Sequence, residues 1–357
     1  MNENELNTLL EGTAEPSDPS QEEQFQKRVR RTMHRALYGR VLACILLVCV
    51  AAAGLFCGTS WAMDRIFYAP EGETTLLQPD DTRPAAEFNL LLADTLATLY
   101  PGKTCWVLGQ PESLGFGRYE IDLLLKNTLD LHVLGGPADA CFTIGFSHLD
   151  TGNAPLPIEL GEFIDPTRPD LQPLYHDSLD TIRQELSGLP RSAVVDVSIS
   201  LPQTLTSDAV AALMRDYPAA QVNWLALAGQ GWDMLPQVAG GMFVRYIGME
   251  ALTPAAQAAY PCYYLPEEIT GQALEQCLVS RLAVLADHPD FVALMQTAFG
   301  DVLSPAQVQQ RLENARAGWA CYGLRLTTDP ETLTALMDSL SPTQVVIHDV
   351  KVSRYQK

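Results

Sequence analysis

Two short pairs of histidine and aspartate are the residues of this chain whose types could do chemistry. His148 lies two positions before Asp150, and His176 directly precedes Asp177. An imidazole beside a carboxylate can act as an acid–base pair or supply ligands to a metal ion. Metal sites use three or four ligands, with a close pair on a defined element, whereas both pairs flank loop-like sequence. We therefore expect no metal, no cofactor, and surface or structural histidines.

Glycine-rich and catalytic motifs give no stronger signal. The sequence contains no HExxH, no GxSxG, no P-loop and no Rossmann fingerprint after an expected strand. The segment from Ala228 to Asp233 lacks the P-loop lysine and a third glycine, so it indicates a tight turn, as does Gly115-Phe116-Gly117. We expect a protein that is not an enzyme. A membrane-tethered hydrolase that depends on His148, His176 or His288 is the alternative.

The most informative element is an uncharged, apolar run over residues 41–63, which we expect to be a transmembrane helix. A run of this length is long enough to cross a bilayer core of about 30 Å. It also exceeds the usual core of a signal peptide, about 7 to 15 residues, so an uncleaved anchor is expected, although Ser60-Trp61-Ala62 resembles a cleavage site. The predicted contacts with the lipid bilayer are Val41, Leu46, Val50, Leu55 and Trp61.

A basic cluster directly precedes the apolar run. Basic residues beside a transmembrane helix favour the cytoplasmic side. We therefore expect a cell-membrane protein with a single pass, a cytoplasmic segment over residues 1–40 and a large extracytoplasmic body after residue 63. The basic residues are Lys27, Arg28, Arg30, Arg31, Arg35 and Arg40.

Four apolar residues of the cytoplasmic segment recur at intervals of four positions. Phe25, Val29, Met33 and Leu37 would therefore line one stripe of a helix over residues 24–38. One interpretation is a helix whose basic residues rest on the anionic inner leaflet. The other is a docking helix that presents the stripe to a cytoplasmic protein. Residues 1–23 are an acidic, polar tail that cannot bury enough apolar surface to fold alone.

The charge and cysteine content restrict the function of the body. The whole chain has a net charge of −20, and nearly all of it lies outside residues 1–40, which hold seven acidic and six basic residues. Such an acidic surface repels phosphate backbones, so we expect no nucleic-acid partner. Five cysteines lie in the body: Cys105, Cys141, Cys262, Cys277 and Cys321. One or two disulfides or buried free thiols both fit this number.

Residues 64–85 are expected to form a linker, exposed from residue 69 onward because of its Pro, Asp, Glu and Thr content. Residues 86–190 form a first α+β region and residues 191–357 a C-terminal domain. In the first region the pattern predicts helices over 86–99 and 179–187 and strands over 104–108, 118–125, 131–134 and 141–146. The aromatic segment 260–266 indicates either core packing or a partner surface.

An internal repeat with a spacing of 123 residues organises the C-terminal domain. Ala212-Leu213-Met214 recurs as Ala335-Leu336-Met337, and Gln221-Val222 recurs as Gln344-Val345. Each copy predicts strand, helix, strand, with Ser207 and Asp329 as the N-caps of the two helices. Two such βαβ units indicate an α+β fold, for which a ferredoxin-like core is one solution. The predicted segments are 193–201, 207–217 and 221–227, then 320–327, 330–340 and 344–352, with a strand over 241–247 and helices over 271–286, 289–299 and 305–317 between the copies.

Residues 190–355 resemble the C-terminal domain of the membrane-anchored sigma factor regulators (anti-sigma factors) of Gram-positive bacteria. The similarity is a pattern of hydrophobic strands that includes a "WLA"-like strand and a late "YG" strand. Residues before 120 fit that family in layout only. The segments that carry the resemblance are Val194–Leu201, Val222–Leu227, Gln310–Ala315, Trp319–Thr327 and Val350–Val352.

The resemblance implies signal transduction and transcription regulation. The cytoplasmic segment would hold an extracytoplasmic-function sigma factor inactive, and the outer domain would sense envelope conditions, for instance through an unknown extracellular ligand. This segment is short for wrapping a sigma factor and has no Cys/His zinc pattern, so contact with a second regulator is an alternative. The other alternative is an extracytoplasmic binding or envelope-assembly module without a sigma factor partner.

Overall fold

A computed structural model describes residues 19–70, 75–78, 87–107, 110–127, 129, 140–152, 163–166, 177–228, 240–244 and 252–352. The chain divides into two compact units, Met1–Ala62 and Met63–Lys357. We describe each unit by itself. The second unit is a mixed α and β structure, as the sequence predicts.

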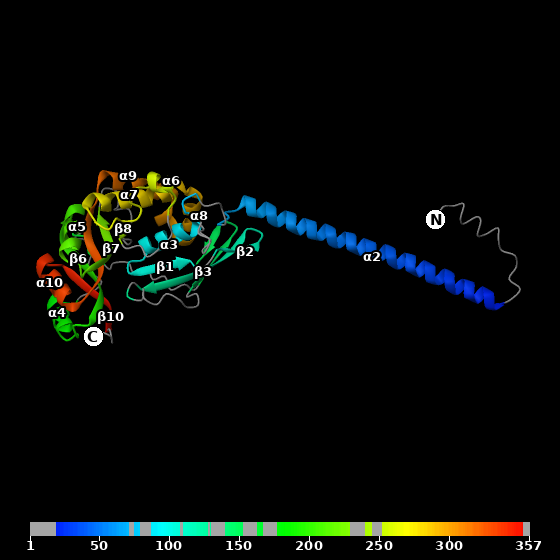
Figure 1. Cartoon of the computed structure of the whole chain (residues 1–357), viewed down its shortest axis with the longest axis horizontal. Coiled ribbons are helices and arrows are strands. Elements are labelled where there is room, and N and C mark those ends of the chain that lie inside the picture. Colours follow the sequence, from blue (N-terminus) through cyan, green and yellow to red (C-terminus); the bar gives the residue numbers. More distant parts are fainter. Residues whose placement is uncertain are drawn as a thin grey trace. The chain divides into compact units, whose positions relative to one another are not determined.

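Helix α2 (Pro19–Ile66) dominates the first unit (Figure 1). It is a single helix of 48 residues that includes both the expected basic helix and the expected transmembrane helix. At a rise of about 1.5 Å per residue, the apolar run 41–63 extends over about 35 Å, which is sufficient for a bilayer core. In the described part of the chain, one helix is long and apolar enough to cross a membrane, over Val29–Ile66.

The smaller sheet of the second unit is antiparallel. Strands β1 (Lys103–Val107), β3 (Arg118–Asn127), β4 (Ala140–Gly145) and β5 (His148–Asp150) lie in that order, and β2 (Glu112–Gly115) pairs with β3. Three of the expected strands are confirmed as β1, β3 and β4. The strand expected over 131–134 lies outside the described residues.

The two faces of this sheet differ in polarity. Residues alternate between buried and exposed along β4 and β5. The inner face carries Tyr119, Ile121, Phe142, Ile144 and Leu149, which share a hydrophobic core with α3 (Glu87–Leu99) and α8 (Pro289–Phe299). The residues between these positions point the other way, and among them Glu120, Asp122 and Thr143 are exposed polar residues of the outer face.

The larger sheet contains both copies of the repeat. Its order is β10 (Gln344–Val352), β6 (Ala193–Leu205), β9 (Ala320–Thr328), β7 (Gln221–Ala228) and β8 (Gly240–Phe243), and all neighbours are antiparallel. The first copy is β6, α5 (Ser207–Asp216) and β7, and the second is β9, α10 (Pro330–Leu340) and β10. The two strands of each copy are separated by a strand of the other copy, so the copies are interleaved.

Helices cover both faces of the larger sheet. On one face, apolar side chains of β6, β7 and β9 share a core with α4 (Leu179–Ser187), α5, α7 (Gly271–Asp287) and α10. On the other face, Trp224 stacks on Phe163 and its Nε1 donates a hydrogen bond of 3.2 Å to the carbonyl of Thr98 in α3. Helix α3 therefore packs against both sheets.

Helix α7 joins the two cores. Its residue Leu278 belongs to the core of the larger sheet, whereas Leu285 belongs to the core of the smaller sheet. It packs against α9 (Pro305–Ala317), α5 and α8. The short helix α6 (Pro254–Ala259) and the 3₁₀ helix η2 (Gly300–Leu303) complete this layer.

Two expectations for local structure are wrong. The N-cap of α5 is Thr206, whose side chain accepts a hydrogen bond from the Ala209 N–H, so Ser207 is instead the first helical residue. Threonine and serine hydroxyls can both cap a helix. Here the extended backbone of Thr206 places its hydroxyl at the N-cap position. Leu76 and Leu77 lie in the expected exposed linker but are buried, because they pack into the core of the smaller sheet.

Candidate functional site

The stripe predicted to bind a partner lies on helix α2. Val29, Met33 and Leu37 are exposed, with Met33 at 71% of its full accessible area. Phe25 belongs to the same helix, but its side chain lies outside the described residues. Since the three positions follow at intervals of four, they lie on one face of the helix. The arrangement leaves an apolar edge that a groove of another protein could cover.

The predicted anchor residues follow the stripe on the same helix. Val41, Leu46, Val50, Leu55 and Trp61 are all exposed, between 48% and 71% of their full accessible areas. Exposure of this long apolar surface to water would be unfavourable, whereas lipid tails would cover it. These residues therefore have the exposure that a membrane-spanning helix requires.

The last turn of α2 and the two residues after it are fixed to two tight turns of the smaller sheet. The Gly117 N–H donates a hydrogen bond of 2.8 Å to Asp64, and the Tyr68 N–H donates one of 2.8 Å to the Ser147 hydroxyl. Phe67 packs edge-on against Phe146. All these residues belong to the second unit, so its fold directly positions Asp64, Phe67 and Tyr68.

Backbone conformation explains why these two turns can hold that segment. Gly117 has a φ of 68°, and a Cβ atom added there would lie 3.0 Å from the Phe67 ring. Phe146 and Ser147 also adopt positive φ values, of 54° and 58°. The turn predicted at residues 115–117 is confirmed as the connection between β2 and β3.

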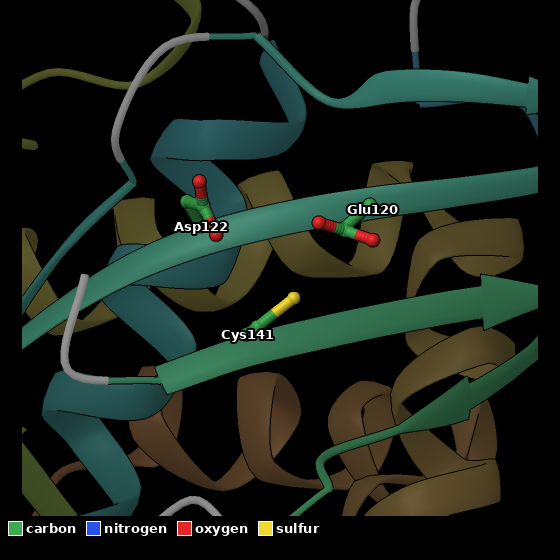
Figure 2. Close-up of side chains that lie close together, drawn as sticks. All are labelled: Glu120, Asp122 and Cys141. Atoms are coloured by element: carbon green, nitrogen blue, oxygen red, sulfur yellow. The ribbon is translucent and has the colours of Figure 1, made fainter.

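A group of possible metal ligands lies on the outer face of the smaller sheet. Glu120 and Asp122 of β3 and Cys141 of β4 place one ligand atom each within 4.8 Å of the others. Figure 2 shows the thiol pointing toward the space beside the two carboxylates. Asp122 is directly opposite Cys141 in the strand pairing, and Glu120 is two positions away on the same face. Sequence reasoning missed this group.

We call Glu120, Asp122 and Cys141 the acid–thiol group. Its surroundings favour the protonated form of Cys141. Partial burial, together with the negative charges of Glu120 and Asp122, raises the pKa of the Cys141 thiol. A divalent cation would reverse this preference, because metals bind the thiolate. Two carboxylates and one thiol could hold part of a coordination shell, with the remaining positions open to water.

A pocket of about 670 Å³ lies at the edge of the larger sheet. Its walls include Met214 at the end of α5, Val222 of β7, and Ile269 of the loop before α7. Arg215 and Glu268 contribute opposite charges to its lining. A volume in this range is typical of small-molecule sites, which are about 300–1,000 Å³.

The aromatic segment 260–266 packs mainly inward. Tyr263 is buried, and its carbonyl accepts hydrogen bonds from Arg281 and from the Cys277 thiol. Tyr260 and Tyr264 pack partly against the core of the smaller sheet. Tyr264 also reaches the pocket with Leu265 and Pro266. Core packing thus accounts for most of the segment.

The remaining residues considered from the sequence do not form one site. His148 and Asp150 are exposed on β5, Asp177 is exposed before α4, and His176 lies outside the described residues. The cysteines whose side chains the structure describes form no disulfide bond. Cys277 and Cys321 are buried, and burial raises the pKa of Cys321 to about 12.

Comparisons of the chain with protein-family models, curated proteins and solved structures found no match.

Proposed function

We propose that this chain is a single-pass membrane regulator of the anti-sigma-factor type. Its N-terminal segment would bind an extracytoplasmic-function sigma factor, and its body would sense conditions outside the cell. The observation that best supports this proposal is the exposed apolar stripe of Val29, Met33 and Leu37, which directly precedes the candidate membrane span on the same helix. The strand pattern that resembles the regulator family supports it independently.

The proposed orientation places the N-terminus in the cytoplasm. Lys27, Arg30, Arg31 and Arg40 lie on α2 before the apolar run, and such residues favour retention on the inner side. The acidic body then lies outside, where neither nucleic acid nor the anionic inner leaflet would repel it. Protease protection of the body in intact cells, with cleavage near residue 30 only after lysis, is the expected topology result.

We further propose that Ala193–Val352 contains a ferredoxin-like core. The four strands of the two repeat copies, numbered along the chain, follow the spatial order 4-1-3-2 with antiparallel neighbours. Helices α5 and α10 contribute to the same hydrophobic core. The split βαβ motif has this interleaved arrangement. Strand β8 and helices α6 to α9 are additions to it.

The proposed signal path passes through the last turn of α2 and the two residues after it, which we call the exit of α2. A change in the body that moves the turns at Gly117 and Ser147 would also move Asp64 and Tyr68. Hydrogen bonds join Gly117 to Asp64 and Ser147 to Tyr68. In this mechanism the changed exit alters the anchor or exposes it to a protease, and the cytoplasmic segment then releases its partner. The chain itself needs no catalytic residue for any of these steps.

The decisive experiment is cross-linking and affinity capture of the full-length protein from membranes of its own host, followed by mass spectrometry. We expect a sigma factor to be captured by the wild-type chain and lost in the double variant Val29→Asp, Met33→Asp, since two charges would disrupt the apolar stripe. The control is Tyr38→Asp, which adds one such charge at an exposed position on another face of the helix. Equal capture by the double variant would refute the stripe as the contact face.

A membrane-anchored binding module is the second candidate function. The pocket of about 670 Å³ favours it, because a cavity of that size can enclose a small ligand without any cytoplasmic partner. This candidate predicts that replacing residues 1–40 with an unrelated basic segment preserves function. The sigma-factor proposal predicts that the same replacement raises transcription of the target genes.

A further inference from the structure

His288 lies at the corner between α7 and α8 and contacts two hydrogen-bond acceptors. Its Nδ1 is 2.6 Å from the carbonyl oxygen of Val284, and its Nε2 is bonded to a carboxylate oxygen of Glu87 at the start of α3. A carbonyl and a carboxylate can only accept. Both ring nitrogens must therefore carry a proton to satisfy both contacts, which describes the imidazolium form.

Glu87 extends this contact to a third part of the chain. Its second carboxylate oxygen accepts a hydrogen bond of 3.0 Å from the Thr75 N–H. The segment 75–78 is also bonded to the two residues before α6, since the Thr253 N–H donates to the Leu76 carbonyl and the Gln78 amide donates to the Leu252 carbonyl. His288, through Glu87, thus helps to fix a segment that follows α2 in the chain.

Several other ionisable groups surround the pair. Tyr68, after α2, faces the charges of Glu87 and Asp290, and burial together with these charges raises the Tyr68 pKa. The Tyr260 hydroxyl donates a hydrogen bond of 2.7 Å to Asp287, at the end of α7. Burial together with Asp287 raises the Tyr260 pKa to about 12, so both phenols stay neutral. Among the residues that the structure describes, the carboxylates that act on His288 or on Tyr68 are those of Glu87, Asp287 and Asp290.

We infer that His288 and Glu87 form a pH-dependent clasp, in which the imidazolium holds the segment 75–78 and the neutral imidazole releases it. A neutral ring has one N–H for two acceptors, so it must abandon either Val284 or Glu87. If it abandons Glu87, the carboxylate that holds Thr75 loses its counter-charge in a half-buried position. The inference stands on these contacts and does not depend on the proposed sigma factor partner.

The pKa shifts determine in which direction the clasp opens. The hydrogen bond to Glu87 raises the pKa of His288 above its ordinary 6.5, against the opposing effect of burial. Its stabilising effect is therefore complete below 6.5 and is lost as the pH rises through the raised value. For Glu87, burial acts to raise the pKa, but the bonds from His288 and Thr75 lower it below 4.5. Its contribution is lost only as the pH falls through that lowered value. The clasp is thus closed in mild acid and opens toward alkaline pH.

Hydrogen exchange of the full-length chain in lipid nanodiscs, followed by mass spectrometry, tests the clasp. The exchange rates of peptides that cover Thr75–Gln78 would be measured from about pH 5 to about pH 9, which brackets the ordinary histidine value, and corrected for intrinsic exchange. We expect protection in the wild-type chain to fall by about tenfold or more across this range, because a charge-assisted bond is lost. The His288→Gln variant should show low protection at every pH.

Two further variants keep the test sharp. His148→Gln removes an exposed histidine on β5 and should behave as wild type. Glu87→Gln keeps the size of the side chain but removes its charge, so it should flatten the pH dependence even if His288→Gln fails to fold. Protection that does not change with pH in the wild-type chain would overturn the inference. An unchanged pH dependence in Glu87→Gln would do so as well.

Discussion

Arg325 and Asp196 form a bidentate ion pair between neighbouring strands of the larger sheet, and both N–O distances are 2.8 Å. The two side chains are only 6% and 2% exposed. A third nitrogen of Arg325 contacts the Ser198 hydroxyl at 3.4 Å. The guanidinium also fills the space beside Gly102, where an added Cβ would lie 2.5 Å from it. A fixed polar contact therefore lies among the buried residues of the body.

Removal of one partner of this pair should strongly destabilise the body. We expect Arg325→Met or Asp196→Asn to lower the free energy of unfolding by about 3–5 kcal/mol, because the remaining charge stays buried without a partner. Denaturant unfolding in detergent, monitored by tryptophan fluorescence, measures this loss. Arg183→Ala is the control, since its pair with Asp338 is exposed and should contribute less than about 1 kcal/mol. A loss in Arg183→Ala as large as the loss in Arg325→Met or Asp196→Asn would contradict the prediction.

Charged residues in the middle of the apolar run should prevent membrane insertion. Val50→Arg and Leu55→Arg together should cost about 5–7 kcal/mol, since one arginine near the helix centre costs about 2.5–3.5 kcal/mol. The double variant should be extracted from membranes by alkaline carbonate, while the wild-type chain stays in the pellet. Gly39→Arg, which adds a base before the run, should stay in the pellet too. Retention of the double variant would mean that this helix is not the anchor.

Cys141 should react slowly with alkylating reagents although it is exposed. The thiolate is the reactive form, and partial burial with Glu120 and Asp122 raises the thiol pKa. The double variant Glu120→Gln, Asp122→Asn should therefore be alkylated faster at neutral pH, as measured by mass spectrometry of the Cys141 peptide. Glu112→Gln is the control, because Glu112 lies opposite Glu120 in the strand pairing but outside the ligand group. Unchanged rates in the double variant would show that the carboxylates do not control the thiol.

The sequence predicts the elements of this fold better than their contacts. The helix α4 matches the expected 179–187, and the helices expected over 271–286, 289–299 and 305–317 are confirmed within one residue at each end. Local periodicity and capping residues determine these elements. The sequence does not predict the strands β2 and β5, because three or four residues are too few to show a clear alternation. Nor does it predict helix α6, because six residues are too few to show a helical period.

The contacts that could matter for function join residues far apart in the sequence. Asp196 and Arg325 are 129 positions apart, and Glu87 and His288 are 201 positions apart. No local pattern determines such pairs. The acid–thiol group depends on the register between β3 and β4, which places Asp122 opposite Cys141. Alternation in each strand indicates which face a residue occupies, but it does not give the register. The prediction for the stripe on α2 could be made because its residues lie on one helix.

The N-caps of the two repeat copies give a prediction that depends on pH. In α10, Asp329 accepts a hydrogen bond of 2.8 Å from the Thr332 N–H, and in α5 the equivalent cap is the neutral Thr206. Burial acts to raise the pKa of Asp329, but the hydrogen bonds from Thr332 hold it below 3.8. Asp329→Ala should cost about 1 kcal/mol of unfolding free energy at neutral pH. Since the ionised cap is the stabilising form, this cost should be complete above 3.8 and shrink as the pH falls through the lowered value.

The matched variant Thr206→Ala should cost a similar amount, but its cost should not change with pH, because a hydroxyl does not titrate in this range. Unfolding of both variants in detergent between about pH 3 and about pH 7 separates the two cases, as this range spans the ordinary aspartate value. A cost for Asp329→Ala that stays constant with pH would mean that the carboxylate charge does not stabilise α10. Parallel curves for the two variants would lead to the same conclusion, because the two caps would then act only as neutral acceptors.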